Sequence, residues 1–227
     1  MQSVFVPSEE LTTDGEAAYS TGCLSILLWP PFSAVLFGVA LFFALSQIRF
    51  RPAELQGQAH DGEVASFFTP QVQRWESDLL VWSAVFGLDP NLAATVMQIE
   101  SCGDPFAVSP AGAMGLFQVM PYHFSQGENS FDPRTNAARG LSYLQRSLNE
   151  FGADPGMALA GYNGGINGAG RPQQLWAQET NDYKYWGEHI YADAIAGKAE
   201  SPVLQEWLAR GGASLCAQAE QRAAGSP

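Results

Sequence analysis

Glu100 is well placed for acid chemistry, because it ends an apolar segment and precedes a stretch rich in Gly, Ala and Pro. On a helix, Val96 and Met97 lie four and three residues before it, which puts its carboxyl at the edge of the apolar face. The last helical turn also opposes ionisation through the negative end of the helix dipole. Both effects raise a carboxyl pKa, so the position suits a general acid. A helix-terminal glutamate that simply reaches water is the alternative.

Further motifs follow Glu100-Ser101 in a fixed order. From Ala107 to Pro121 the chain reads Ala-x-Ser-x-x-Gly-Ala-x-Gly-Leu-x-Gln-x-Met-Pro. A Tyr-Asn-x-Gly motif follows within residues 158–165, and Glu-Thr-x-x-Tyr follows at residues 179–183. Over about residues 68–197 this series resembles the catalytic domain of lytic transglycosylases of the SLT type, glycoside hydrolase family 23, although Gly161 stands where that family usually has Ala.

The resemblance implies a lysozyme-like fold in which Glu100 is the catalytic acid. It also implies a sugar cleft lined by Ser109, Gln118, Met120, Tyr162 and Asn163. The Gln and Asn side chains offer donors and acceptors that suit acetamido and hydroxyl groups. A plain core role for Met120 and a helix-capping role for Asn163 are the alternatives. The resemblance implies no metal and no organic cofactor.

A second carboxylate, which most glycosidases need, is missing from the motif region. No Asp or Glu occurs between Asp104 and Glu128, although Asp132, Asp154 or another distant acid stays open as a source. In the family's reaction one Glu first protonates the MurNAc-GlcNAc bond and then accepts the C6 hydroxyl proton, closing a 1,6-anhydro ring. We therefore expect a peptidoglycan lytic transglycosylase. The alternatives are a goose-type lysozyme hydrolase and an inactive peptidoglycan- or chitin-binding module.

The elements that must position these residues are predicted to be helices. Capping residues precede proline at Thr69, Asp89, Asp132 and Asp154, a pattern typical of helix starts. Apolar residues at three- and four-residue spacing continue the first helix to Gly87, and a fifth helix is expected at residues 182–196. Residues 107–120 have strand-like character. The predicted fold is mostly α, in a lysozyme-like α+β arrangement with one small β-hairpin.

The first 67 residues predict a membrane anchor. Residues 23–48 carry no charge over a length that crosses about 30 Å of hydrocarbon as a helix. A buried core helix and a cleaved signal peptide are the alternatives. The predicted organisation is an acidic tail (1–22), a transmembrane helix (23–48), a linker (49–67), the catalytic domain (68–197) and a C-terminal segment (198–227). Leu204 and Trp207 in the last segment are typical of one more packed helix.

Charge and cysteines narrow the partners and the compartment. A net charge of −12 with 11 Lys and Arg argues against nucleic acid and favours a neutral or carbohydrate-like ligand. Cys23 lies in the apolar run, which leaves Cys102 and Cys216 as the candidate disulfide. Two arginines after residue 48 favour a cytosolic domain by the positive-inside rule. Peptidoglycan strands, the expected partner, lie outside, so we expect a single-pass membrane protein with an extracytoplasmic domain.

Overall fold

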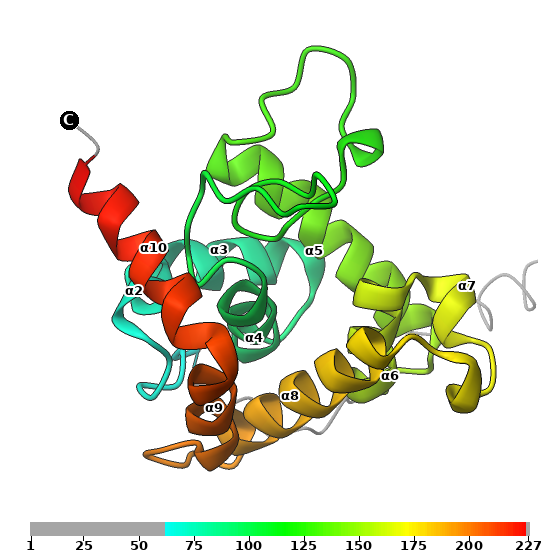
Figure 1. Cartoon of the computed structure of the whole chain (residues 1–227). Helices are drawn as coiled ribbons and strands as arrows, with labels where there is room; N and C mark the ends of the chain where they lie inside the picture. The colour runs from blue at the N-terminus through cyan, green and yellow to red at the C-terminus, as the bar shows by residue number, and fades with distance from the viewer. Residues whose placement is uncertain (1–61, 226–227) are drawn as a thin grey trace, which may run out of the picture. The chain divides into compact units, whose positions relative to one another are not determined.

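The computed structural model describes residues 62–225, which fold into a domain built from helices (Figure 1). The prediction of a mostly helical domain is confirmed. The predicted acidic tail, the transmembrane helix at 23–48 and most of the linker lie outside the described residues. The helical elements, in chain order, are α2 (Pro70–Gln73), α3 (Glu76–Phe86), α4 (Pro90–Glu100), η1 (Pro121–His123), α5 (Pro133–Glu150), α6 (Pro155–Gly164), α7 (Ile166–Ala169), η2 (Gln173–Leu175), α8 (Gln178–Ile195), α9 (Pro202–Trp207), η3 (Leu208–Gly212) and α10 (Ala213–Gly225).

The core is organised around α4, which packs against α3 and α8 (Figure 1). Every residue of α4 from Asn91 to Gln98 is buried. Helix α6 packs between α5 and α8, and α5 also contacts α3. The large side chains at the centre of this core include Leu79, Leu92, Met97, Leu116, Phe117, Leu141, Leu144, Leu159, Ile190 and Leu204. A helix this deeply buried holds its last residue in a fixed place.

Local capping explains where several helices begin. The side chains of Asp89, Asp132 and Asp154 each accept a hydrogen bond from a backbone N–H of the first helical turn, and proline occupies the next position. The predicted starts of α4, α5 and α6 are therefore confirmed. Helix α8 begins at Gln178, four residues before the predicted start.

The prediction of one continuous helix up to Gly87 was wrong. The chain leaves the helix after α2 and resumes it at α3, with Trp75 between them at φ −97° and ψ 6°. Trp75 donates its indole N–H to the carbonyl of Gly103, 2.9 Å away. A long-range contact therefore accompanies the break, which helical spacing alone does not indicate.

The predicted β-hairpin was also wrong. Residues 62–225 contain no strand, and the 107–120 loop has only isolated bridges, from Met114 to Val108 and to Val119. Gly112, Gly115 and Gln118 have φ values of 88°, 75° and 45°, so the chain turns between the bridges instead of extending. Continuous pairing needs consecutive extended residues, and this loop lacks them.

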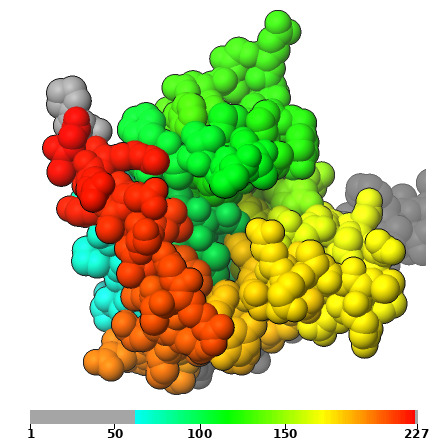
Figure 2. Space-filling view, in the orientation of Figure 1, coloured from blue at the N-terminus to red at the C-terminus, as the bar shows by residue number. Residues whose placement is uncertain are grey.

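The C-terminal segment packs on the domain as α9 and α10, which η3 joins. Ser201 caps α9 through a hydrogen bond from Leu204 N, and the chain bends at Arg210 and Gly211 before α10. Leu204, Trp207, Cys216 and Ala219 join the hydrophobic core. In Figure 2 this segment, orange to red, runs along one side of the domain.

Within residues 62–225, no single helix has the length and apolar composition to cross a membrane. The pair α3 and α4 passes that test only when taken together, across a bend of 118°.

Candidate active site

Glu100 is the last residue of α4, where the buried helix reaches the surface of a cleft. Burial raises the pKa of its carboxyl to about 8; the nearby negative charge of Glu179 raises it further, while the hydroxyl of Tyr183 acts to lower it. No Lys or Arg among the described residues forms an ion pair with Glu100. The carboxyl therefore keeps its proton at neutral pH.

Two tyrosines flank this carboxyl. The hydroxyl of Tyr162 donates to the carbonyl of Phe117, 2.7 Å away. The side chain of Tyr183 is 5% exposed, and its hydroxyl interacts with the Glu100 carboxyl, whose pKa it lowers by hydrogen bonding. Burial and the proximity of Glu100 hold both phenol pKa values well above the usual 10, so both hydroxyls stay protonated. They are neutral polar groups beside the acid.

The 107–120 loop is held against α4 and α5 by polar contacts. Ser101 Oγ donates to the carbonyl of Leu116 at 2.7 Å. The buried Asn136 of α5 accepts from Phe117 N at 2.8 Å and donates to the carbonyl of Met114 at 2.7 Å. These bonds satisfy backbone groups that a strand would pair with a neighbour. The loop thus forms a fixed wall beside Glu100.

The main cleft, of about 590 Å³, brings the candidate residues together. Its lining includes Glu100, Ser109, Gln118, Met120, Tyr162 and Asn163. In Figure 2 the green loop region and the yellow α7 region lie on two sides of a recess. A second hollow, of about 440 Å³, shares Glu100, Asn163 and Glu179 with this cleft and extends along Tyr183 and Trp186. The acid is therefore open from two directions.

Several of these side chains also hold the cleft walls in place. Ser109 Oγ accepts from Ala113 N at 3.0 Å. Gln118 donates its Nε2 to the carbonyls of Ala107 and Gly115, at 3.2 and 2.9 Å. Asn163 Oδ1 accepts from the Thr180 hydroxyl at 2.9 Å. The Ser109 O–H, the side-chain oxygen of Gln118 and the side-chain N–H groups of Asn163 take no part in these bonds and are available to hydrogen-bond a ligand.

Other cleft residues were missed by the sequence analysis: Tyr122, His123, Arg139, Tyr143, Arg171, Leu175 and Trp176. Aromatic rings from η1, α5 and α6 form a row. The ring centroid of His123 is 4.6 Å from that of Tyr122 and 5.1 Å from that of Tyr143, whose centroid is 5.8 Å from that of Tyr162. Burial and the charge of Arg146 lower the pKa of His123, which favours its neutral form. The four-residue spacing of Arg139 and Tyr143 on α5 was the one local signal for this wall.

A second carboxylate does lie near Glu100. Glu179, at the start of α8, lines both hollows, and its charge acts on the Glu100 carboxyl. The sequence analysis left a distant acid open but did not name Glu179 as that source. Residues 62–225 contain no group of three or more His, Cys, Asp or Glu side chains arranged to hold a metal ion.

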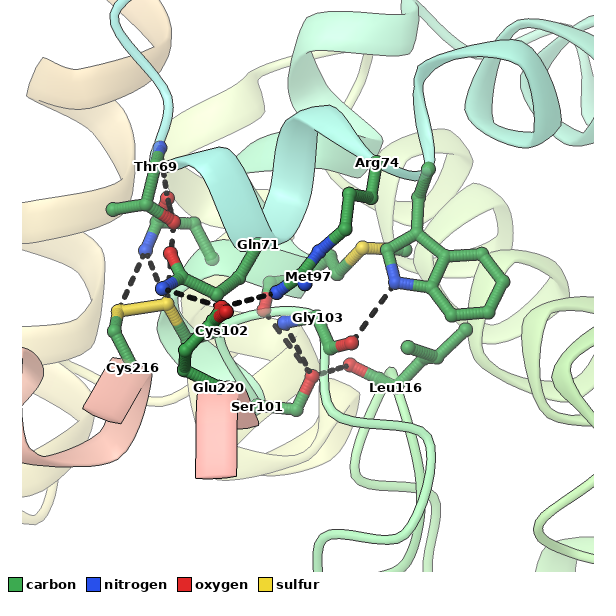
Figure 3. Close-up of a disulfide and its surroundings, with 12 residues drawn as sticks. Thr69, Gln71, Arg74, Met97, Ser101, Cys102, Gly103, Leu116, Cys216 and Glu220 are labelled. Carbon is green, nitrogen blue, oxygen red and sulfur yellow. Dashed lines mark hydrogen bonds and ion pairs between the residues drawn. A yellow bond between two sulfur atoms is a disulfide. The ribbon is translucent and has the colours of Figure 1, made fainter. Parts of the chain in front are cut away.

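The remaining candidate pair, Cys102 and Cys216, is bonded as a disulfide with a Cα–Cα distance of 5.0 Å (Figure 3). It joins the loop that follows Glu100 to α10.

Comparison with known proteins identifies the class of this domain. Residues 80–185 match the family model of the transglycosylase SLT domain, and the predicted resemblance to that family is confirmed. The matched segment begins inside α3 and ends inside α8, and includes Glu100 and the 107–120 loop. Helices α9 and α10 lie outside it.

Among curated proteins, the chain is similar to a transglycosylase of Enterobacteria phage PRD1, with 40% identity over 114 residues, which are 49% of this chain and 40% of that protein. A membrane-bound lytic murein transglycosylase C of Mannheimia succiniciproducens is 33% identical over 101 residues, 39% of this chain and 28% of that protein. The chain thus spans less than half the length of these relatives. A solved lytic transglycosylase Slt of Pseudomonas aeruginosa aligns with a TM-score of 0.46 and 21% identity, over 59% of this chain and 26% of that one.

Proposed function

We propose that this protein is a lytic transglycosylase that cleaves the MurNAc-GlcNAc β-1,4 bond of peptidoglycan and forms a 1,6-anhydro-MurNAc end. The observation that carries the proposal is Glu100, a carboxyl with a pKa of about 8 and no cationic partner within residues 62–225, in the cleft of an SLT domain. Such a group is still protonated at neutral pH, as a general acid must be. The two curated relatives are both transglycosylases, which supports the same class of reaction for this chain.

In the first step Glu100 gives its proton to the glycosidic oxygen. The bond between that oxygen and C1 of MurNAc breaks, and the acetamido group of the same sugar stabilises the positive charge that develops at C1. The hydroxyls of Tyr162 and Tyr183 are neutral and carry no competing charge at this point. The departing GlcNAc leaves with the proton.

In the second step the C6 hydroxyl of MurNAc attacks C1, and Glu100, now a carboxylate, accepts its proton. This closes the anhydro ring and restores the acid for the next cycle. No water is consumed, so one carboxyl serves as acid and then as base. The burial that raises the pKa of Glu100 also makes its carboxylate a better base.

The two hollows that meet at Glu100 favour a polymeric substrate. A glycan strand bound across the acid would occupy the main cleft on one side of the broken bond and the second hollow on the other. The ring row of Tyr122, His123 and Tyr143 offers apolar faces to sugar rings. The amide of Gln118 and that of Asn163 offer hydrogen bonds to acetamido groups.

Glu179 favours one alternative, a goose-type lysozyme hydrolase. An exposed carboxylate beside the acid could activate a water molecule, which would then attack C1 in place of the C6 hydroxyl. The two reactions differ in product, because hydrolysis leaves a hydrated reducing end.

Product analysis tests the proposal. Wild-type protein incubated with purified peptidoglycan is expected to release muropeptides that mass spectrometry identifies as anhydro forms, and Glu100→Gln is expected to abolish their release while the circular dichroism spectrum is unchanged. With Glu179→Gln, anhydro products are expected to remain the main species. The control is Asp182→Asn, which changes another acid at the second hollow and is expected to give the same result. Hydrated products that disappear in Glu179→Gln would favour the hydrolase instead.

We also propose that the domain is held on the outer side of a membrane by the segment at 23–48. The absence of charge over that segment and the Cys102–Cys216 disulfide support this placement, because disulfides persist in oxidising compartments. Protease added to intact cells is expected to digest the domain. Full protection of the domain would contradict the placement.

A further inference from the structure

Helix α10 is attached to the short loop that directly follows Glu100. Cys216 of α10 is bonded to Cys102, two residues after the acid, and Arg222 of α10 forms an ion pair with Asp104. Arg222 also donates to the carbonyl of Phe106 at 3.1 Å. All three ties reach across more than 110 residues, from outside the segment that matches the SLT family to the loop of residues 101–106.

This loop has a backbone that needs support. Cys102 has a φ of 51°, a left-handed conformation that residues with a side chain rarely adopt, and Gly103 follows with a φ of 76°. At Gly103 a Cβ atom would lie 2.6 Å from the carbonyl oxygen of Gln71, so the loop lies directly against α2. Two successive left-handed residues in close contact with a helix are stable only where surrounding contacts hold them.

The contacts of α10 extend to α2 as well. Glu220 accepts from Arg74 at 2.6 Å and from Gln71 at 3.3 Å. Figure 3 shows Cys102 and Cys216 with Arg74, Gln71 and Glu220 around them. Helix α10 therefore connects the loop and α2 from one side.

The end of α4 is coupled to the same group of contacts. Gln98, fully buried, directs its Nε2 at both sulfur atoms, 3.2 Å from Cys102 and 3.5 Å from Cys216, and its Oε1 accepts from Thr69 N at 3.1 Å. The last helical bonds of α4 run from Ser101 N to Met97 O and from Cys102 N to Gln98 O. A shift of the loop would therefore move the helical turn that carries Glu100.

We propose that α10 is a brace for the catalytic acid, with Arg222 and the disulfide as positioning elements that fix the direction of the Glu100 carboxyl through residues 101–104. This inference rests on the proposed function for its kinetic consequences. The brace makes the C-terminal segment part of the active unit, although it lies beyond the matched family segment.

The test compares Arg222→Gln with Lys198→Gln in the full-length chain. Each change removes the cation of an ion pair with a buried Asp. Arg222 pairs with Asp104, and Lys198 pairs with Asp193. The positioning role predicts that Arg222→Gln lowers kcat on soluble glycan strands about tenfold with KM changed less than twofold, and that Arg222→Lys restores most of it. Lys198→Gln is expected to keep kcat within twofold, even where thermal unfolding shows an equal loss of stability.

A second readout needs no turnover. The carboxyl of Glu100, followed by NMR of glutamate labelled with ¹³C, is expected to titrate at lower pH in Arg222→Gln and in the double variant Cys102→Ser/Cys216→Ser than in wild type, because a displaced carboxyl gains water. If Arg222→Gln does not fold, Glu220→Gln removes the exposed tie to Arg74 and is expected to change both readouts in the same direction, by less.

Equal kcat and equal Glu100 titration in Arg222→Gln and Lys198→Gln would overturn the brace. A wild-type chain that releases no cleavage product would overturn the proposed function alone. The NMR titration would then still decide whether α10 controls Glu100.

Discussion

Glu100 and Asp104 lie four residues apart on either side of a tight loop, and the fold surrounds their carboxyls differently. Asp104 is 3% exposed, accepts from Phe106 N at 2.9 Å and is paired with Arg222. Glu100 meets no cation within the described residues; its neighbours are the neutral hydroxyl of Tyr183 and the negative charge of Glu179. The charge of Asp104 is therefore compensated by a cation, whereas Glu100 is an uncompensated acid within the described residues.

A third acid shows which arrangement is the structural one. Asp193 is 7% exposed and receives hydrogen bonds from Lys198 at 2.5 Å and Ser201 at 2.7 Å. Burial alone would raise its pKa, but these two bonds offset burial and hold the pKa below its usual value. Removing the cation from such a buried pair would leave an uncompensated charge and destabilise the fold. An acid that lies in a cleft without a cation and has a raised pKa is a candidate for chemistry.

After the loss expected from Glu100→Gln, the largest effect is expected when the uncompensated acid keeps its carboxyl but is moved. Glu100→Asp keeps a carboxyl but shortens the side chain by one methylene group. Because a displacement of about 1 Å can cost about 100-fold in rate, kcat on peptidoglycan is expected to fall by about 10²–10³. Release of anhydro muropeptides, measured by mass spectrometry at matched enzyme concentration, checks this. Activity within threefold of wild type would mean that burial of the carboxyl is sufficient for catalysis and that its exact position is not required.

Stability is expected to respond to pH in opposite ways at the two kinds of acid. The folded pKa of Glu100, about 8, exceeds its usual 4.5, so the folded state retains a proton that the unfolded chain releases. Wild-type stability therefore falls from pH 4.5 to pH 8 through this group. Glu100→Gln is expected to remove that fall and to stabilise the protein by about 1–3 kcal/mol at pH 9 relative to pH 5. This is less than the roughly 5 kcal/mol of the full pKa change, because the side chain is partly exposed.

Asp193→Asn is the matched change at a compensated acid. The lowered pKa of Asp193 means that its carboxylate stabilises the fold above pH 4, and that this stability is lost as the pH falls through the folded pKa. The variant is expected to lose about 1–2 kcal/mol at pH 7 and less at pH 3. Urea unfolding across pH measures both variants. The same sign of pH dependence in both would contradict the distinction between the two kinds of acid.

The helices around these acids could be predicted where local chemistry decides. At Asp89, Asp132 and Asp154 a capping side chain and a following proline act within one turn, so the sequence alone located each start. The break at Trp75 and the irregular path of the 107–120 loop depend on partners such as Gly103 and Asn136, which are distant in sequence. Periodicity and strand propensity contain no information on such partners.

The candidate site also contains residues that the local sequence predicts and residues that only distant contacts place. Glu100 was predicted from helix position and motif order, and the structure places it with the other motif residues in one cleft. Tyr122 comes from the short helix η1 and Trp176 from the residue after η2, and only the packing of these short elements brings the two side chains to the cleft. Glu179 was part of a recognised motif, yet its charge on Glu100 needed coordinates to be seen.

The smallest effect is expected at Tyr183. Among the neighbours that act on the pKa of Glu100, its hydroxyl is the one that lowers it, as cationic partners do for compensated acids. This hydroxyl lowers the pKa of the carboxyl, so Tyr183→Phe is expected to raise it further above 8. The basic limb of the kcat/KM profile should then move to higher pH by less than one unit, with kcat at pH 7 within threefold of wild type. Tyr162→Phe is the control, since it breaks the bond to Phe117 O and should cost about 1 kcal/mol of stability. A basic limb that moves to lower pH in Tyr183→Phe would mean that the hydroxyl supports the protonated acid instead.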